Sequence, residues 1–334
     1  MSDIFRDQIL VHVGLHKCGS TWMQGHLFAQ PEHGFYAPLG RIAAAAVSAF
    51  VAADPVSFDA ETARRQLEAA AQPRPEAANL ITVISHEALS SRPHHGHYYA
   101  PTVAQQIRQV FSQPKILLVF REQSKLIYSL YGEHIRNGGR DRLQAFIGTG
   151  QEPEGFHPKC RLAFFHFDRL IKMYQDVFGE ANVLAMPLEY LAEDPADFTA
   201  RIFQFCGKEN RNIPPAPPAY AGDVPLATEF IRFCNGFIVK DPLSARRTLG
   251  IRARQRLVRL INSFTPQDVS RRQKYRIMTL IQGRMGSEFD QSNQRLAAMT
   301  GFDLGRYGYR GFSKQASDQS NDEARTLGVQ MKSA

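Results

Sequence analysis

The stretch from Ile9 to Trp22 constrains the fold of this chain more than any other. It reads Ile-Leu-Val-His-Val-Gly-Leu-His-Lys-Cys-Gly-Ser-Thr-Trp. The short apolar run bounded by Gly14 predicts a buried strand, and the apolar residues on one face after Ser20 predict a helix. The two glycines of the intervening loop let backbone N–H groups line a concave surface, and the positive end of the helix adds to it. The stretch therefore predicts a loop suited to binding phosphate.

The loop differs from the phosphate loop of nucleoside triphosphatases in the place of its lysine. Gly14 and Gly19 have the spacing of that motif, but Ser20 occupies the lysine position, and the cation is Lys17 inside the loop. There the lysine would face the first phosphate to enter rather than a terminal one. No strand ends in a lone Asp that could hold Mg²⁺. The pattern favours an anion site whose reaction needs no metal.

Length and composition are those of an ordinary globular protein. A chain of 334 residues can form one large α/β domain, or one domain with an appended lobe. No apolar run is long enough to span a membrane, and the N-terminus has no signal-peptide pattern, which predicts a cytoplasmic protein. The scattered cysteines form no C-x-x-C pair, which predicts reduced thiols rather than a zinc site or disulfides: Cys18, Cys160, Cys206 and Cys234.

Alternating strands and helices follow the loop. Dense apolar runs predict strands over residues 79–85, 115–120 and 182–187. Helices are expected over residues 41–53, 59–71, 102–111, 161–178 and 197–206, and a further helix follows the 115–120 strand and ends at about residue 136. A loop is expected over residues 31–40. This order predicts an α/β fold, a single domain with a central parallel sheet flanked by helices. Ligands bind outside the carboxyl ends of such strands. Four side chains stand there: Lys17, His86, Glu87 and Arg121.

The C-terminal part of the chain is basic and helical in pattern. It follows a Pro-rich segment at residues 213–218, the strongest linker signal in the chain, and we expect one domain over 1–312 and a polar tail over 313–334. Between Lys240 and Arg276 there are eleven Lys or Arg and two Asp, a net charge of 11 − 2 = +9. This basic window could contact the nucleotide, an anionic acceptor, or only solvent.

Three segments resemble the sulfotransferases that use 3′-phosphoadenosine 5′-phosphosulfate (PAPS). Lys17-Cys18-Gly19-Ser20-Thr21-Trp22 after an apolar strand resembles their 5′-phosphosulfate loop. Arg121 at a strand end and Ser129 eight residues later match their 3′-phosphate motif. Residues 187–195 and the apolar helix after them resemble a structural segment that follows the fourth strand. Together these segments cover roughly half of the chain in the expected order.

The resemblance implies a site and a reaction. His16 to Trp22 would contact the 5′-phosphosulfate, and Arg121 and Ser129 the 3′-phosphate; Lys17 would also stabilise charge on the leaving phosphate. The base would be Glu87 or His86, and Ser85-His86-Glu87 is similar to the S-x-E of carbohydrate and bacterial members. The Gly-rich loop of the cytosolic steroid and phenol members is absent. The acceptor would be a small molecule or glycan rather than a nucleic acid, and the oligomeric state stays open.

Other interpretations of the same residues are possible. A nucleotide or small-molecule kinase uses a similar loop, but lacks the lysine placement found here, and a polyanion-binding protein would use only the basic window. His94, His95 and His97 could suggest a metal, but no carboxylate or cysteine completes that cluster, and a solvated loop near the acceptor entrance is expected instead. Cys18 beside Lys17 could have a lowered pKa, although a small loop residue is the simpler interpretation.

Overall fold

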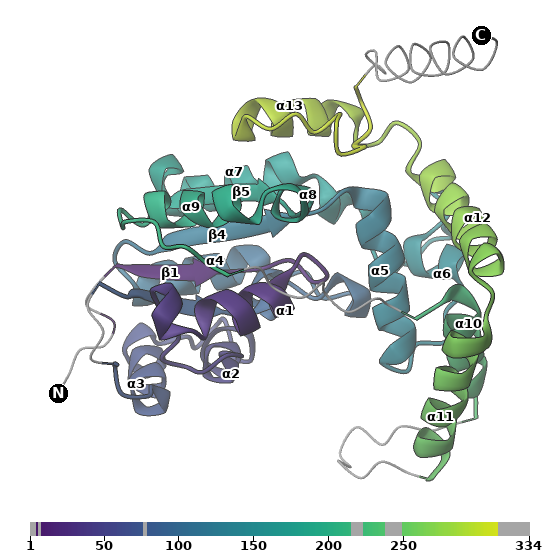
Figure 1. Cartoon of the computed structure of the whole chain (residues 1–334), viewed down its shortest axis with the longest axis horizontal. Coiled ribbons are helices and arrows are strands. Elements are labelled where there is room, and N and C mark those ends of the chain that lie inside the picture. The colour runs from purple at the N-terminus through teal and green to yellow at the C-terminus, as the bar shows by residue number, and fades with distance from the viewer. Residues whose placement is uncertain (1–4, 6–7, 76–78, 215–222, 238–248, 313–334) are drawn as a thin grey trace, which may run out of the picture.

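A five-stranded parallel sheet forms the centre of the molecule (Figure 1). The computed structural model describes residues 5, 8–75, 79–214, 223–237 and 249–312. The strand order is β2-β3-β1-β4-β5, with these bounds: β1 Ile9–His12, β2 Phe35–Tyr36, β3 Ile81–Ser85, β4 Lys115–Phe120 and β5 Val183–Pro187. Helices flank the sheet. The α/β fold with a central parallel sheet is therefore confirmed.

The strands are buried on both faces, which explains their continuous apolar runs. All of β1 and β3 is buried, as is β4 after Lys115. In the centre of the sheet, Val11 of β1 pairs with Ile84 on one side and Ile116 on the other. Since all five strands run in the same direction, their carboxyl ends meet at one edge, where the polar residues predicted to form the site follow them.

One strand lies in a segment predicted to be a loop. Residues 31–40 contain the 3₁₀ turn η2 (Pro31–His33) and then β2, whose Phe35 and Tyr36 pair with Ile81 and Thr82 of β3. The prediction of a continuous loop is wrong here. Two residues are too few to show the alternation by which a strand is recognised in sequence.

The helices of the first 205 residues mostly follow the prediction. The predicted helix over 161–178 is interrupted at His166, whose ψ of 81° is not helical, and the one over 41–53 is shorter and ends in a π-helical turn. The bounds are α1 Ser20–Trp22, η1 Met23–Phe28, α2 Ala44–Ala46, η3 Val47–Val51, α3 Ala60–Ala70, η4 Glu87–Ser90, η5 Pro93–His95, α4 Ala100–Val110, α5 Gln123–Arg136, α6 Leu143–Ile147, η6 Leu162–Phe165, α7 Phe167–Phe178, η7 Glu180–Asn182, α8 Leu188–Glu193 and α9 Pro195–Phe205.

Helix α5 lies between the sheet and helices α10 to α12, whereas α13 lies over α7 (Figure 1). Helices α10 and α12 pack on α5, and α13 packs on α7. Buried residues of these helices, such as Ile281, Met285 and Leu296, join the same hydrophobic core as the sheet. The bounds are α10 Pro225–Cys234, α11 Leu249–Phe264, α12 Gln267–Met285 and α13 Asp290–Thr300.

The predicted linker and tail cannot be compared with the structure. Residues 215–218 of the Pro-rich segment and the tail over 313–334 lie outside the described residues, so the domain boundaries stay a prediction. Among the helices that the structure does describe, none combines the length and the apolar character needed to cross a membrane.

Candidate active site

The predicted phosphate loop connects β1 to α1 and is built on left-handed backbone. Gly14, Lys17 and Gly19 have φ of +36°, +67° and +82°. The N–H of Cys18 donates to the Leu15 carbonyl at 3.2 Å, which makes Lys17 the third residue of a tight turn. Such a turn needs a positive φ at that position, which a residue with a Cβ adopts at a cost of about 1 kcal/mol. The loop thus keeps its lysine at a place where glycine is the easier residue.

The two glycines are closely surrounded. A Cβ on Gly14 would lie 3.0 Å from the His12 ring and 3.0 Å from Ser20 Oγ, and a Cβ on Gly19 would lie 2.8 Å from Leu188 of α8. The Ser90 hydroxyl donates to the Gly14 carbonyl at 2.5 Å. The loop is therefore held between the end of β3 and the start of α8.

Polar atoms without partners are buried beside this loop. Ser20 Oγ, His12 Nε2 and His16 Nε2 are buried and have no hydrogen-bond partner. His12 binds Ser85 Oγ through Nδ1 at 2.8 Å. An unpaired buried donor is costly, and an incoming oxyanion would satisfy the Ser20 hydroxyl at the start of the helix. This part of the loop fits a phosphate or sulfate group.

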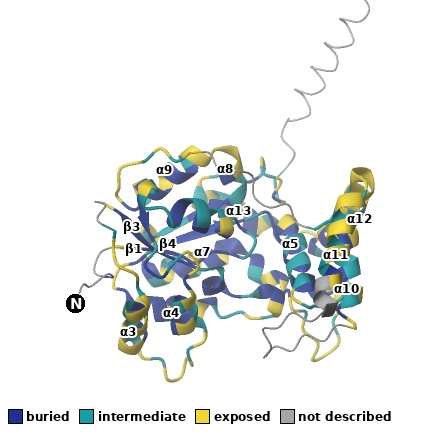
Figure 2. Ribbon diagram, turned by 60° about the horizontal axis from the view of Figure 1, so that its bottom comes forward, coloured by how far each residue is buried: buried dark blue, intermediate teal, exposed yellow. Residues whose placement is uncertain are grey.

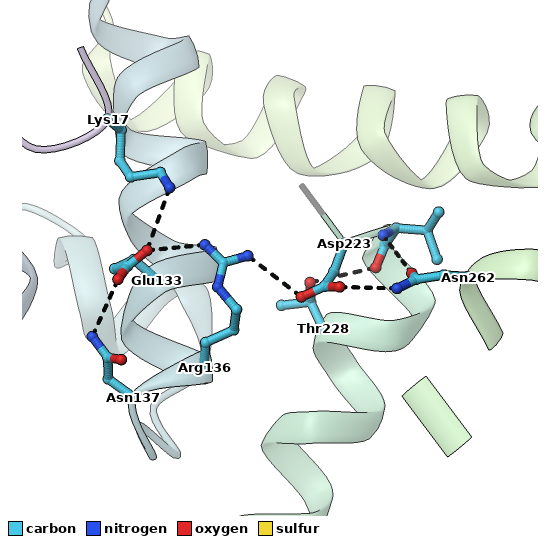
Figure 3. Close-up of polar contacts among 8 residues, drawn as sticks. Lys17, Glu133, Arg136, Asn137, Asp223, Thr228 and Asn262 are labelled. Carbon is cyan, nitrogen blue, oxygen red and sulfur yellow. Dashed lines mark hydrogen bonds and ion pairs between the residues drawn. The ribbon is translucent and has the colours of Figure 1, made fainter. Parts of the chain in front are cut away.

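The Lys17 ammonium lies 3.4 Å from the Glu133 carboxylate of α5 (Figure 3). Glu133 also accepts from Arg136 at 2.9 Å, and Arg136 reaches Asp223 at 3.4 Å. Asp223 in turn accepts from Asn262 of α11 at 2.9 Å. One chain of polar contacts thus connects the loop lysine to the C-terminal helices.

Glu133 is a charged group at all ordinary pH. Burial alone would raise its pKa, but the hydrogen bond and charge of Arg136 together with the charge of Lys17 lower the pKa to about 2. The carboxylate is shared by two cations. Lys17 can therefore leave it for another anion while Arg136 still neutralises Glu133.

Arg121 lies at the end of β4 as predicted, and it contacts the loop directly. Its guanidinium donates to the Lys17 carbonyl at 3.3 Å. The next residue, the buried Glu122, caps α5 by accepting from the N–H groups of Ser124 and Lys125 at 2.9 Å each. Ser129 is half-buried on α5, four residues before Glu133 and so on the same helix face. The structure brings Lys17, Arg121 and the Ser129 face of α5 to one place.

His86 and Glu87 follow β3 and differ in their hydrogen bonds. His86 Nδ1 accepts from the Ala88 N–H at 2.9 Å, so the neutral ring carries its proton on Nε2. Burial lowers the pKa of His86, although the charge of Glu87 opposes this shift. Glu87 accepts from the amide of the buried Gln24 at 3.4 Å. In this geometry Nε2 of the neutral His86 ring is a donor, whereas Glu87 keeps a carboxylate oxygen that can accept a proton.

The histidine-rich segment is not a solvated loop throughout, which corrects the prediction. His94 is 3% exposed, and its ring lies 4.5 Å from the His16 ring and 4.3 Å from the His95 ring. Burial lowers the pKa of His16 and of His94 to about 3 each, so both are neutral near pH 7. His95 and His97 are exposed. The row of rings extends from the phosphate loop to the surface.

Two further expectations concern Cys18 and metals. Cys18 is fully buried, and burial raises the pKa of its thiol above the usual range, so a reactive thiolate at this position is excluded. In the part of the chain that the structure describes, no group of three or more His, Cys, Asp or Glu side chains is arranged to hold a metal ion. That the reaction needs no metal stays a prediction.

Comparison with known proteins identifies the family. A family model described as a sulfotransferase domain matches residues 6–213, more than half of the chain. The chain belongs to the sulfotransferase family. The crystal structure of a sulfotransferase from Alicyclobacillus acidocaldarius superposes with a TM-score of 0.54 at 14% identity, covering 90% of this chain and 98% of that one. At this identity the likeness concerns the fold. No curated protein matches the sequence significantly.

The sequence did not reveal which residues form hydrogen bonds or ion pairs with the site residues of this sulfotransferase. Glu133 contacts Lys17 across 116 positions of sequence, and Gln24 contacts Glu87 across 63. Glu189 of α8 accepts from the Glu122 N–H at 3.2 Å and so links the segment after β4 to the helix after β5. The spacing of Ser129 and Glu133 was the only available signal, since it places Glu133 on the helix face that bears Ser129.

Proposed function

We propose that this sulfotransferase moves a sulfonyl group from PAPS to a hydroxyl or amine of a small-molecule or glycan acceptor. The observation that carries the proposal is that one loop holds both Lys17, at a positive φ, and Ser20, whose buried hydroxyl at the helix start has no hydrogen-bond partner. Both groups favour an anion at the helix start. The family match to residues 6–213 supports the same chemistry.

In this proposal the two ends of the nucleotide are held by different segments. His16, Lys17, Cys18, Gly19, Ser20, Thr21 and Trp22 form the 5′-phosphosulfate loop, and of these the buried Cys18 contributes backbone only. Arg121 and Ser129 hold the 3′-phosphate. The bond from Arg121 to the Lys17 carbonyl uses one of the five guanidinium donors and leaves others for phosphate oxygens. The same bond couples the two halves of the nucleotide site.

The reaction joins the acceptor oxygen or nitrogen to sulfur as the bond from sulfur to the 5′-phosphate oxygen breaks. The electron pair of that bond stays on the phosphate, where Lys17 stabilises the added charge after leaving Glu133. The acceptor proton goes to Glu87 in this scheme, because His86 Nδ1 is already engaged by the Ala88 N–H. His86 then acts as a donor through Nε2. No step requires a metal.

A reducing compartment such as the cytoplasm suits this enzyme. Its four cysteines are free, and Cys18, Cys160 and Cys206 are buried.

Thermal unfolding in the presence of three ligands tests the proposal. PAP, the nucleotide product, at about 100 times its dissociation constant should raise the free energy of unfolding by about 2.7 kcal/mol. ATP with Mg²⁺ and heparin serve as the probes for a kinase and for a polyanion-binding protein. Stabilisation by ATP with Mg²⁺ but not by PAP would refute the proposal. A screen of acceptors with labelled PAPS would then identify the second substrate.

A further inference from the structure

Exposed large apolar side chains are concentrated in α10 to α12. Of the thirteen such side chains among the described residues, eight lie in these helices and a ninth, Phe237, lies just after α10. They are Leu226, Phe233, Phe237, Leu257, Leu260, Phe264, Val269, Tyr275 and Leu280. Figure 2 shows the same helices as an exposed group at the edge of the molecule. Exposed apolar patches often mark interaction surfaces, so this part of the chain is where such a surface is expected.

Helix α11 carries the clearest apolar face. Leu257, Leu260 and Phe264 are 47%, 51% and 79% exposed, and their spacing of three and four residues places them on one side of the helix. Arg256 and Arg259 each precede one of the leucines, so both lie on the same flank of that face, and both are exposed. We call these five residues the α11 surface.

The charge of the α11 surface is not neutralised within the described residues. No ion pair between them involves Arg256 or Arg259. From Ala253 to Arg276 the sequence has seven Lys or Arg and a single acidic residue, Asp268. A partner of opposite charge is therefore expected, and it must also accept leucine and phenylalanine side chains.

Other sides of α11 are fixed to the rest of the molecule: Arg254, three residues before Leu257, flanks the apolar face away from Arg256 and Arg259, and Asn262 lies opposite that face. Arg254 is buried and donates to the Asn235 side chain at 2.6 Å, and Asn235 donates to the carbonyls of Ile135 and Gly139 at 2.7 and 2.8 Å. Asn262 donates to Asp223, which lies just before α10 (Figure 3). The α11 surface is thus presented by an anchored helix rather than by a fraying one.

We propose that the α11 surface docks onto an anionic phospholipid bilayer. Leucine and phenylalanine would enter the boundary between headgroups and acyl chains while the arginines meet lipid phosphates, as in interfacial amphipathic helices. A second copy of the chain fits less well, because a two-fold contact between identical surfaces would bring the same arginines together. The proposal goes beyond sulfonyl transfer and does not depend on it.

Sedimentation with vesicles tests the proposal on the full chain. Vesicles of phosphatidylcholine mixed with phosphatidylglycerol should bind the protein, whereas phosphatidylcholine alone should bind it weakly, and added salt should weaken the binding. Arg256→Gln and Arg259→Gln should each lower the affinity about fivefold. Leu257→Ser with Leu260→Ser should abolish binding. Val56→Ser and Arg65→Gln, exposed residues near and on the remote α3, are matched controls that should leave it unchanged.

Three results would overturn the proposal. These are no binding to either vesicle, equal binding to both, or equal losses in the control variants. Sedimentation velocity supplies the competing outcome: self-association that is lost in Leu257→Ser with Leu260→Ser would assign the surface to a second copy. Unchanged thermal unfolding of each variant, and unchanged stabilisation by PAP, would show that the fold and the nucleotide site are intact.

Discussion

At the scale of single residues, Lys17 shows which features of the candidate site the sequence could predict and which it could not. Its position in the loop follows from the spacing of Gly14 and Gly19. Its φ of +67° and its contact with Glu133 do not follow from the sequence. The φ depends on the geometry of the turn, and the contact depends on how α5 packs against the loop. Sequence favoured Glu87 only slightly over His86 as the base, and the proposal of Glu87 now rests on hydrogen bonds from Gln24 to Glu87 and from the Ala88 N–H to His86. Roles of residues follow from contacts that short motifs do not contain.

Two substitutions of Lys17 separate its chemistry from its backbone conformation. Both Lys17→Ala and Lys17→Gly should abolish turnover, because each removes the cation. Gly tolerates a φ of +67° and Ala does not, so Lys17→Gly should be more stable than Lys17→Ala by about 1 kcal/mol. Chemical denaturation of the two variants measures the difference, and both lose the same ion pair. Equal or reversed stabilities would contradict the strained turn.

The base can be identified by two conservative variants. Glu87→Gln should lower kcat by about 10²- to 10⁴-fold, because the amide cannot accept the acceptor proton. His86→Asn should have little effect, since Asn can still accept from the Ala88 N–H that His86 now binds. Steady-state kinetics with PAP affinity as the control distinguishes them. A large loss in His86→Asn alone would assign the base to His86.

At the scale of elements, long apolar runs were predicted well and short or bent elements were not. Strands β1, β3, β4 and β5 are mostly buried and mostly apolar, so their sequences are distinctive. The two-residue β2 and the break at His166 depend on pairing and packing with distant segments. The sequence therefore predicted at which edge of the sheet the candidate site lies, but it did not predict every element that surrounds the site.

Gly19 tests how tightly the loop fits against α8. Gly19→Ala should destabilise the protein, because its Cβ would lie 2.8 Å from Leu188 and its φ is +82°. We expect a loss of about 1–3 kcal/mol with weaker PAP binding. Leu188→Ala in the Gly19→Ala background should restore binding only in part, since it removes the contact and leaves the strained backbone. Urea unfolding and PAP titration of both variants provide the comparison.

Glu133 tests the contact between α5 and the loop. In Glu133→Gln the lysine no longer has to leave a carboxylate, so the affinity for PAP should rise, by up to about fivefold for an ion pair whose side chains are 31% and 28% exposed. Arg136→Gln is the control, since it removes the other cation and leaves the contact with Lys17. Calorimetric titration with PAP measures both. Weaker binding in Glu133→Gln would mean that Glu133 holds the loop in its binding conformation.

At the scale of the whole molecule, buried neutral histidines should make stability depend on pH. His12 is fully buried, and burial lowers its pKa to about 4 against the opposing charge of Glu87. The unfolded chain binds the proton at about pH 6.5 and the folded chain near pH 4, so stability falls as pH falls through this window.

His12→Asn should reduce that loss, because Asn can still bind Ser85 but does not titrate. Between pH 6.5 and 4 the variant should lose about 3 kcal/mol less free energy of unfolding than the parent protein. Denaturation at several pH values measures the two slopes, and the difference at pH 8 gives the packing effect alone. Parallel slopes would show that His12 does not contribute.

The shared core has a consequence for how this chain can be divided. The family model ends at residue 213, but Ile281, Met285 and Leu296 are buried in the same core as β4, and Asp223 binds Arg136 from beyond that point. A chain cut after residue 213 would expose the outer face of α5 and leave that contact unmade. The region recognised as a family domain is therefore not a separable module, and swapping it between relatives would require exchanging its C-terminal helices as well.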